Sequence, residues 1–294
     1  MGRTKEAGFQ IASGGCAGFV EVSLMHPLDL VKTRFQIQGG QNDATRYRSL
    51  RDCFVSIYRS EGLASFYKGI LPPILAETPK RATKFFTFEQ YKRAFNFESF
   101  PLPIVFSFAG LLSGLTGAIV INPFEVIKVR LQAQRDVTLL QQKSTFATAR
   151  EIIKTSGIGR DGINRGLSAT LGRHGVWNMV YFGLYHSIKQ TYVPPTEPAL
   201  NVAFRLLLGF TAGSLASVIN IPFDVAKSRI QGPQPATGRK YFGAFQAINL
   251  IYREEGFLAL YKGLVPKLMR LGPGGAIMLI VYETVYDTLI STFG

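Results

Sequence analysis

Six long stretches of apolar and small residues alternate with polar segments along the chain. Each is long enough to cross a bilayer as a helix, which takes about 20 residues. These stretches lie at residues 9–36, 70–95, 102–124, 167–192, 202–230 and 264–290. The third contains no charged residue, and prolines interrupt the second at Pro72, Pro73 and Pro79. The pattern predicts six membrane-spanning helices, the second of them broken near its prolines.

Three shorter segments place apolar residues on one side of a helix and charged residues on the other. In the first, Leu50, Phe54 and Ile57 recur at helical spacing, with Arg51 and Asp52 between them. Segments of this kind lie at residues 49–59, 145–155 and 244–252. Such an amphipathic helix lies on a membrane surface. Six spans would put both chain ends on one side of the membrane and these three short helices on the other.

A ten-residue pattern of proline, acid, two bases and glutamine occurs three times. It reads PLDLVKTRFQ, PFEVIKVRLQ and PFDVAKSRIQ, at residues 27–36, 123–132 and 222–231. The copies are 96 and 99 residues apart, and a G-x-x-x-G motif begins 13 residues before each proline. Three copies in one register indicate an internally triplicated chain. We expect repeats at residues 1–97, 98–196 and 197–294.

A second element follows in each copy, and it is degenerate in the middle one. An acid and a glycine open it, and an aromatic residue, a base and a glycine close it, as in EGLASFYKG at residues 61–69 and EGFLALYKG at 255–263. In the middle copy Ser156 replaces the acid, Asn164 replaces the aromatic residue, and two residues are inserted. We therefore expect the local contacts of the middle copy to differ from those of the other two.

The charge balance restricts the partners of the chain. Its 294 residues carry a formal net charge of +14, and 47% of them are hydrophobic. Such an excess of bases suits acidic partners, either nucleic acid or anionic lipid. The two cysteines, Cys16 and Cys53, make no disulfide framework, and no Cys/His cluster has metal-ligand spacing. We expect no cofactor and no metal, and residues 1–10 lack the apolar core of a secretory signal.

These features make the chain similar to the mitochondrial carrier family. The three P-x-[D/E]-x-x-[K/R]-x-[K/R] stretches, spread over six spans, carry a resemblance that covers essentially the whole chain. It implies an all-α membrane protein of three tandem repeats, each with two transmembrane helices and a short matrix surface helix, in a six-helix pseudo-threefold bundle. It also implies a monomer in the mitochondrial inner membrane, with both termini on the intermembrane-space side and anionic lipid (cardiolipin) at the matrix side.

The proline stretches offer an acid and a base three residues apart, which share one helix face. The resemblance implies a matrix gate in which each acid meets the base of the next repeat. The implied pairs are Asp29–Lys128, Glu125–Lys227 and Asp224–Lys32, braced by hydrogen bonds from Gln36, Gln132 and Gln231. The alternative is a set of solvated helix-end charges, but charge inside a membrane segment generally marks function. Arg34, Arg130 and Arg229 are expected to face water or lipid headgroups.

The resemblance implies a second, cytoplasmic gate near the ends of the even-numbered spans. The pairs implied there are Glu89–Lys189 and Glu283–Lys92. The third link lacks both members, because His186 stands in place of an acid and Tyr286 in place of a base. We therefore expect this gate to be weaker than the matrix gate.

Internal alignment of the repeats points to a substrate site. Seven residues after the glycine that ends each second element stand Ala76, Arg173 and Arg270, positions that face the mid-cavity in the family. Lys80 lies one turn beyond Ala76, and His174 follows Arg173. Arginine matches a carboxylate with two parallel N–H bonds, so two arginines on different helices suit a dianion. Lys80 would bind a carboxylate and His174 would donate to an oxo oxygen, unless His174 is only a packed helix residue.

Two further charges have no unique assignment in the sequence. Arg81 lies about 100° around the helix from Lys80 and could pair with Glu77 or Glu21. Glu21, the only acid in the outer half of the first span, is either a counter-ion or a proton-coupling site.

Four segments resemble the family members that carry 2-oxodicarboxylates, at residues 66–82, 169–183, 219–235 and 269–276. They imply antiport of 2-oxoadipate, 2-oxoglutarate and related dicarboxylates by alternating access. A carrier of another anion or of an amino acid, and a proton-leak carrier, remain alternatives. A nucleic-acid-binding protein is disfavoured because the basic residues punctuate apolar spans rather than gather on soluble domains. An enzyme is disfavoured because no nucleophile–base set or phosphate loop stands out.

Overall fold

The computed structural model describes residues 3–38, 47–95, 101–135, 137–192, 195–234 and 238–293, and within them every regular element is a helix. The six long helices are α1 (Arg3–Ile37), α3 (Leu71–Ala94), α4 (Leu102–Ala133), α6 (Leu167–Thr191), α7 (Pro198–Gln231) and α9 (Leu264–Phe293). The short ones are α2 (Leu50–Glu61), α5 (Thr145–Ser156) and α8 (Ala244–Glu255), with 3-10 turns at Leu63–Tyr67 and Phe257–Tyr261. The expected six-helix architecture is confirmed.

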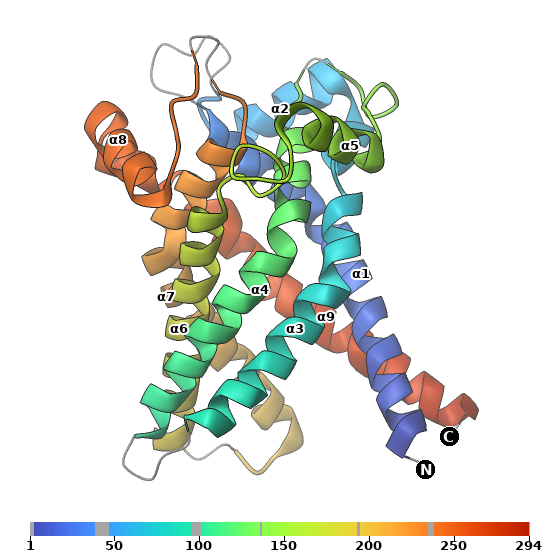
Figure 1. Cartoon of the computed structure of the whole chain (residues 1–294). Helices are drawn as coiled ribbons and strands as arrows, with labels where there is room; N and C mark the ends of the chain where they lie inside the picture. Colours follow the sequence, from blue (N-terminus) through green and yellow to red (C-terminus); the bar gives the residue numbers. More distant parts are fainter. Residues whose placement is uncertain are drawn as a thin grey trace.

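The long helices form one bundle whose two ends differ. The closest packing joins α3 to α4, α4 to α6, α6 to α7, and α1 to α9, so the first and last helices are neighbours. Figure 1 shows α2, α5 and α8 at one end of the bundle and both chain termini at the other. Toward the termini, the ribbons of α1 and α9 run away from those of α4 and α6.

Apolarity alone identifies only part of the bundle as membrane-spanning. Within the described residues, three helical segments are long and apolar enough to cross a membrane: Leu102–Ala133, Leu200–Gln231 and Phe257–Thr292. The helices α1, α3 and α6 have 35, 24 and 25 residues, lengths sufficient for a span. Charges such as Glu77, Lys80 and Arg81 lower the hydropathy of α3, and both bases pair with Glu77.

The expected break in the second span is wrong, because α3 runs without interruption from Leu71 to Ala94. Pro72 and Pro73 occupy its first turn, where the missing N–H would have had no helical partner. Pro79 lies inside the helix, as do Pro27 in α1 and Pro123 in α4. Pro27, Pro79 and Pro123 therefore do not end the helices that contain them.

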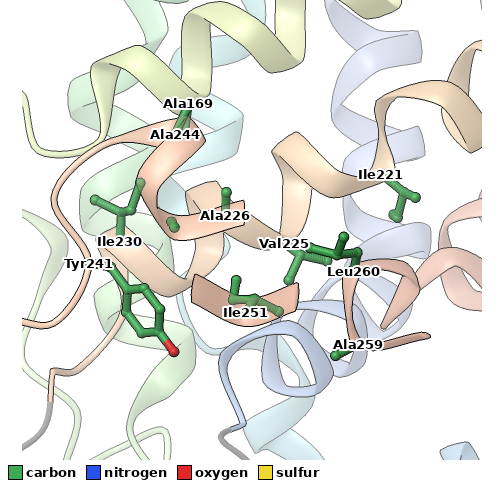
Figure 2. Packing of buried hydrophobic residues seen from close by; sticks show 11 residues of the cluster. Ala169, Ile221, Val225, Ala226, Ile230, Tyr241, Ala244, Ile251, Ala259 and Leu260 are labelled. Atoms are coloured by element: carbon green, nitrogen blue, oxygen red, sulfur yellow. The ribbon is translucent and has the colours of Figure 1, made fainter. Parts of the chain in front are cut away.

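The short helices pack on protein with their apolar faces, rather than only on a membrane surface. Figure 2 shows this for α8, where Ala244 and Ile251 meet Val225 and Ile230 of α7 together with Leu260 of the following turn. Equivalent clusters form around Ile57 of α2 and Ile152 of α5. The surface helices α2, α5 and α8 are thus fixed to the ends of α1, α4 and α7, each by a small apolar core of its own.

Three glycines close the links that follow the short helices, and their backbone conformation favours glycine. Gly69, Gly166 and Gly263 have φ values of +67°, +71° and +83°, which L side chains rarely adopt. A Cβ at each would meet a glutamine side-chain atom of the next repeat at 3.0–3.4 Å: Gln132 at Gly69, Gln231 at Gly166 and Gln36 at Gly263. These glycines therefore let neighbouring repeats approach closely at the proline stretches.

Candidate functional site

The three ion pairs expected for the matrix gate are all formed, and each joins two repeats. The Nζ–carboxylate distances are 2.9 Å for Lys128–Asp29, 3.0 Å for Lys227–Glu125 and 2.9 Å for Lys32–Asp224. The helices α1, α4 and α7 position them, because acid and base share one face of each helix one turn apart. The pairs therefore link the three repeats in a closed ring.

The central arginines also contact the acids of this ring. Arg270 of α9 donates to Asp29 at 2.6 Å and to Glu21 at 2.8 Å. Arg173 of α6 pairs closely with Glu125, and its Nε lies 3.6 Å from Asp224. The two residues expected to hold substrate therefore double as partners of the gate acids, which the sequence did not indicate.

The structure brings the expected substrate residues to one cavity of about 160 Å³. Arg173, Arg270, Lys80 and His174 line it together with the ring of ion pairs. His174 contacts Arg173, and its Nε2 lies 3.6 Å from Glu125. The Lys80 ammonium is 3.2 Å from Glu77 on its own helix, and its side chain is 42% exposed. All four polar groups can therefore reach a ligand in the cavity.

A second cavity of about 250 Å³ shares Lys80, Arg173 and His174 with the first and adds two lysines, Lys84 and Lys267. Lys84 Nζ lies 5.3 Å and 5.2 Å from the ring centroids of Trp177 and Phe182. It has no acidic partner within the described chain. Over both cavities, the lining includes four acids and eight lysine or arginine residues. This excess of positive charge favours an anionic ligand.

Sequence reasoning missed Lys84 and Lys267, although a signal for both was present. Lys84 lies four residues after Lys80, and Lys267 lies three before Arg270, so each shares a helix face with an expected site residue. Lys267 Nζ binds Asp224 at 2.7 Å, so that acid contacts three different bases.

The two unassigned charges have definite partners. Arg81 Nε donates to Glu77 at 2.5 Å, so the alternative of a bond to Glu21 is not realised. Glu21 instead binds Arg270. Its geometry is that of a counter-ion to a central arginine.

The glutamines of the proline stretches do not hydrogen-bond the gate pairs, contrary to the expectation. Gln36 accepts from Ser228 Oγ at 2.8 Å, and Gln132 Nε2 lies 3.5 Å from the His26 ring. Gln231 donates to Asn122 at 3.1 Å. The reason is their position: each lies four residues beyond the gate base and packs sideways against a glycine of the neighbouring repeat.

The second bases of the first and third proline stretches are buried, not solvated as expected. Arg34 is 1% exposed and Arg229 is 3% exposed. Arg34 Nη2 donates to Glu61 at 2.7 Å, and Arg229 Nη2 donates to Glu255 at 2.9 Å. These acids belong to the second element of the same repeat. Each arginine therefore fastens a surface helix to the end of a long helix.

The pairs expected for the cytoplasmic gate are absent among the residues that the structure describes. Glu89 binds Lys92 on its own helix at 2.7 Å, not Lys189. Glu283 has no ion-pair partner within the described ranges. His186, which stands in place of the acid of the second repeat, stacks on Phe106 with 3.6 Å between ring centroids. The structure thus has its ion pairs formed at the end of the proline stretches and unformed at the opposite end.

Comparison with known proteins extends over the whole chain. The family described as mitochondrial carrier protein matches residues 4–99, 103–195 and 198–293. The mitochondrial 2-oxodicarboxylate carrier of Homo sapiens is 59% identical over 97% of this chain and 95% of its own length. That of Mus musculus is 58% identical with the same coverage, and a probable mitochondrial 2-oxodicarboxylate carrier of Dictyostelium discoideum is 40% identical over 95% and 90%. The chain belongs to the mitochondrial carrier family.

Proposed function

We propose that this chain exchanges 2-oxodicarboxylates, including 2-oxoadipate and 2-oxoglutarate, across the mitochondrial inner membrane by alternating access. The observation that carries the proposal is the meeting of Arg173 and Arg270, from α6 and α9, in one cavity with an excess of bases. The near full-length similarity to carriers named for these substrates supports it. No chemical step on the substrate is involved, so we regard the chain as a transporter and not as an enzyme.

Each end of a dianion would bind one guanidinium. Arginine presents two parallel N–H groups to the two oxygens of a carboxylate. Arg173 would hold one carboxylate and Arg270 the other. Lys80 supplies a third cation, and His174, beside Arg173, would donate to the 2-oxo oxygen of the substrate.

Substrate binding would weaken the matrix gate because both arginines already serve it. A carboxylate that takes Arg270 removes a partner from Asp29, and one that takes Arg173 removes partners from Glu125 and Asp224. A hydrogen bond to a charged group is worth about 1.5–3 kcal/mol, so the loss is large enough to shift the gate. A ligand moves such an equilibrium only by binding its states unequally. The empty carrier should therefore stay closed at the matrix end, which makes transport an exchange.

We further propose the orientation and organisation implied by the sequence. Both termini face the intermembrane space, and α2, α5 and α8 face the matrix, where cardiolipin binds. The chain acts as a monomer, and nucleic acid is not a partner.

The repeats are assigned to residues 1–97, 98–196 and 197–294, and the first boundary lies outside the described residues. Glu89, Lys92, Lys189 and Glu283 would form the cytoplasmic gate after the matrix side has opened.

Uptake into liposomes tests the proposed function. Purified protein is reconstituted, and uptake of radiolabelled 2-oxoglutarate is measured with different compounds inside: 2-oxoadipate, 2-oxoglutarate, phosphate, a neutral amino acid or buffer alone. We expect rapid uptake only with an internal 2-oxodicarboxylate. Uptake driven best by the amino acid or by phosphate would assign another substrate. Uptake into vesicles that contain buffer alone would contradict exchange and favour a leak.

A further inference from the structure

The two cavities share Arg173 but differ in the cations that complete them. Arg173, His174 and Lys80 line both cavities. Arg270 lines only the cavity of about 160 Å³, and Lys84 lines only the cavity of about 250 Å³. A dicarboxylate that binds Arg173 through one carboxylate therefore has two directions for the other, toward Arg270 or toward Lys84.

Lys84 lies one helical turn beyond the groups that the two cavities share. On α3 it follows Lys80 by four residues. Across the cavity, its Nζ lies 5.3 Å from the ring centroid of Trp177, which follows Arg173 on α6 by four residues. Four residues of an α-helix rise about 6 Å. Lys84 is therefore suited to the far carboxylate of a substrate that is long enough to extend along this turn.

Lys84 is also the base of these cavities that is left without a close acid. Its ammonium lies over the rings of Trp177 and Phe182 and makes no hydrogen bond or ion pair with the described residues. Glu77 attracts it electrostatically but is already paired with two other bases of α3. The other lysines and arginines that line the cavities each pair with an acid. A cation within a membrane-spanning bundle generally marks function, and this one is free to bind an anion.

The larger cavity departs from the threefold repetition of the chain. Fifteen residues after the repeat glycines stand Lys84, Tyr181 and Met278, so only the first repeat has a charge there. Asn220 lines the same cavity, at a position where the other two repeats have apolar residues. It is 1% exposed, and its side-chain oxygen has no hydrogen-bond donor among the described residues. A gate made by three repeats needs their repetition, whereas a substrate without threefold symmetry is recognised by residues that depart from it.

We propose that Lys84 determines chain-length specificity, by binding the distal carboxylate of 2-oxoadipate in the larger cavity. The inference rests on the proposed function and deepens it. Arg173 and His174 hold the 2-oxo end of either substrate, and the additional methylene of 2-oxoadipate lets its distal carboxylate reach Lys84. The shorter 2-oxoglutarate directs its distal carboxylate to Arg270. Lys84 attracts both dianions from a distance, but only the longer one makes the direct contact.

The specificity ratio, defined as kcat/KM for 2-oxoadipate divided by kcat/KM for 2-oxoglutarate, tests the proposal. It is measured in liposomes that contain the same internal substrate throughout. Lys84→Gln should lower the ratio about 10-fold, the effect of one hydrogen bond to a charged group. Lys84→Met should do the same, because it removes the charge but keeps the length of the side chain, and the third repeat has methionine at this position. Lys84→Arg retains the charge and should keep the ratio close to that of the unmodified chain.

Lys80→Gln is the matched control, since Lys80 lies one turn away on the same helix and lines both cavities. It should slow both substrates alike and leave the specificity ratio unchanged. The proposal is overturned if Lys84→Gln and Lys84→Met keep the ratio of the unmodified chain, or if Lys80→Gln or Lys84→Arg lowers it as much as they do. The proposed function survives each of these results, because both substrates are still exchanged. Failure of the unmodified chain to exchange either substrate would overturn the proposed function, and this inference with it.

Discussion

Single acids in this bundle each contact two bases at once, so the charges form a connected network and not a set of isolated ion pairs. Asp29 binds Lys128 and Arg270, and Asp224 binds Lys32 and Lys267. Removing one partner from such an acid leaves it charged and still partly paired. An incoming carboxylate can therefore compete for the arginine without leaving an acid wholly uncompensated.

At the residue scale, the first prediction concerns the two central arginines. Arg173→Ala and Arg270→Ala should each reduce exchange at least about 10-fold, since each removes charged hydrogen bonds worth about 1.5–3 kcal/mol. Initial rates in liposomes measure the loss, and thermal unfolding checks that the variants fold. Lys154→Ala, which removes an exposed base of the surface helix α5, is the control and should transport normally. Near-normal exchange by either arginine variant would contradict the assigned site.

A second prediction concerns Lys84, which lines the second cavity. Lys84 has no ion-pair partner among the described residues. Lys84→Gln should raise the apparent KM for 2-oxoglutarate by about 3- to 10-fold, because an unpaired ammonium adds to the field that attracts a dianion. Its stability should change little, since no ion pair is lost. The comparison is Lys267→Gln, which deprives Asp224 of a partner at 2.7 Å and should lower Tm. An unchanged KM in Lys84→Gln would show that the residue only packs against Trp177.

At the scale of elements, the short helices depend on buried ion pairs as well as on apolar packing. Glu255 closes α8, and its side chain is 6% exposed between Arg229 and Lys262. Loss of one member of a buried pair leaves the other charges uncompensated. The surface helices are thus structural parts of the bundle end and not loosely attached membrane anchors.

The corresponding prediction is that Glu255→Gln destabilises the fold by about 3–5 kcal/mol. Glu254→Gln, which breaks an exposed pair with Lys240, is the control and should cost under about 1 kcal/mol. Because the pKa of Glu255 is lowered in the folded protein, its contribution is complete above the unfolded value of about 4.3. It is lost as pH falls further. The unfolding curve of Glu255→Gln should therefore converge with that of the unmodified chain in acid, and a constant difference at all pH values would contradict this account.

Much of the architecture could be predicted because it follows from local pattern and from repetition. The apolar pattern predicted six long helices and three short ones, the triplicated proline stretch predicted three repeats, and the resemblance to the family implied the partners Asp29 and Lys128. The environment of a residue could not be predicted where it depends on another repeat. The burial of Arg34, the partners of Gln36 and the continuity of α3 through Pro79 are set by packing across the bundle. The same holds for Arg270, whose bond to Asp29 crosses from the last helix to the first.

At the scale of the whole molecule, the two ends of the bundle are in different states. The ring of ion pairs joins all three repeats at the end near α2, α5 and α8 (Figure 1). At the other end Glu89 bonds within its own helix and Glu283 stands unpaired among the described residues. In the proposed orientation, this is the arrangement of a carrier closed to the matrix and accessible from the cytoplasmic side. Alternating access requires that substrate reverse it.

The most direct test of this account measures access to the cavity from the matrix side. Ala76, which lines the cavity and is 7% exposed, is replaced by cysteine in a Cys16→Ser background. Cys53 can remain, since it is buried and burial raises the pKa of its thiol to about 12. A membrane-impermeant thiol reagent on the matrix side should label this variant slowly alone and several-fold faster with 2-oxoadipate, with no acceleration when Arg173→Ala is added. An equal labelling rate with and without 2-oxoadipate, in protein that still exchanges it, would contradict substrate-dependent opening of the matrix gate.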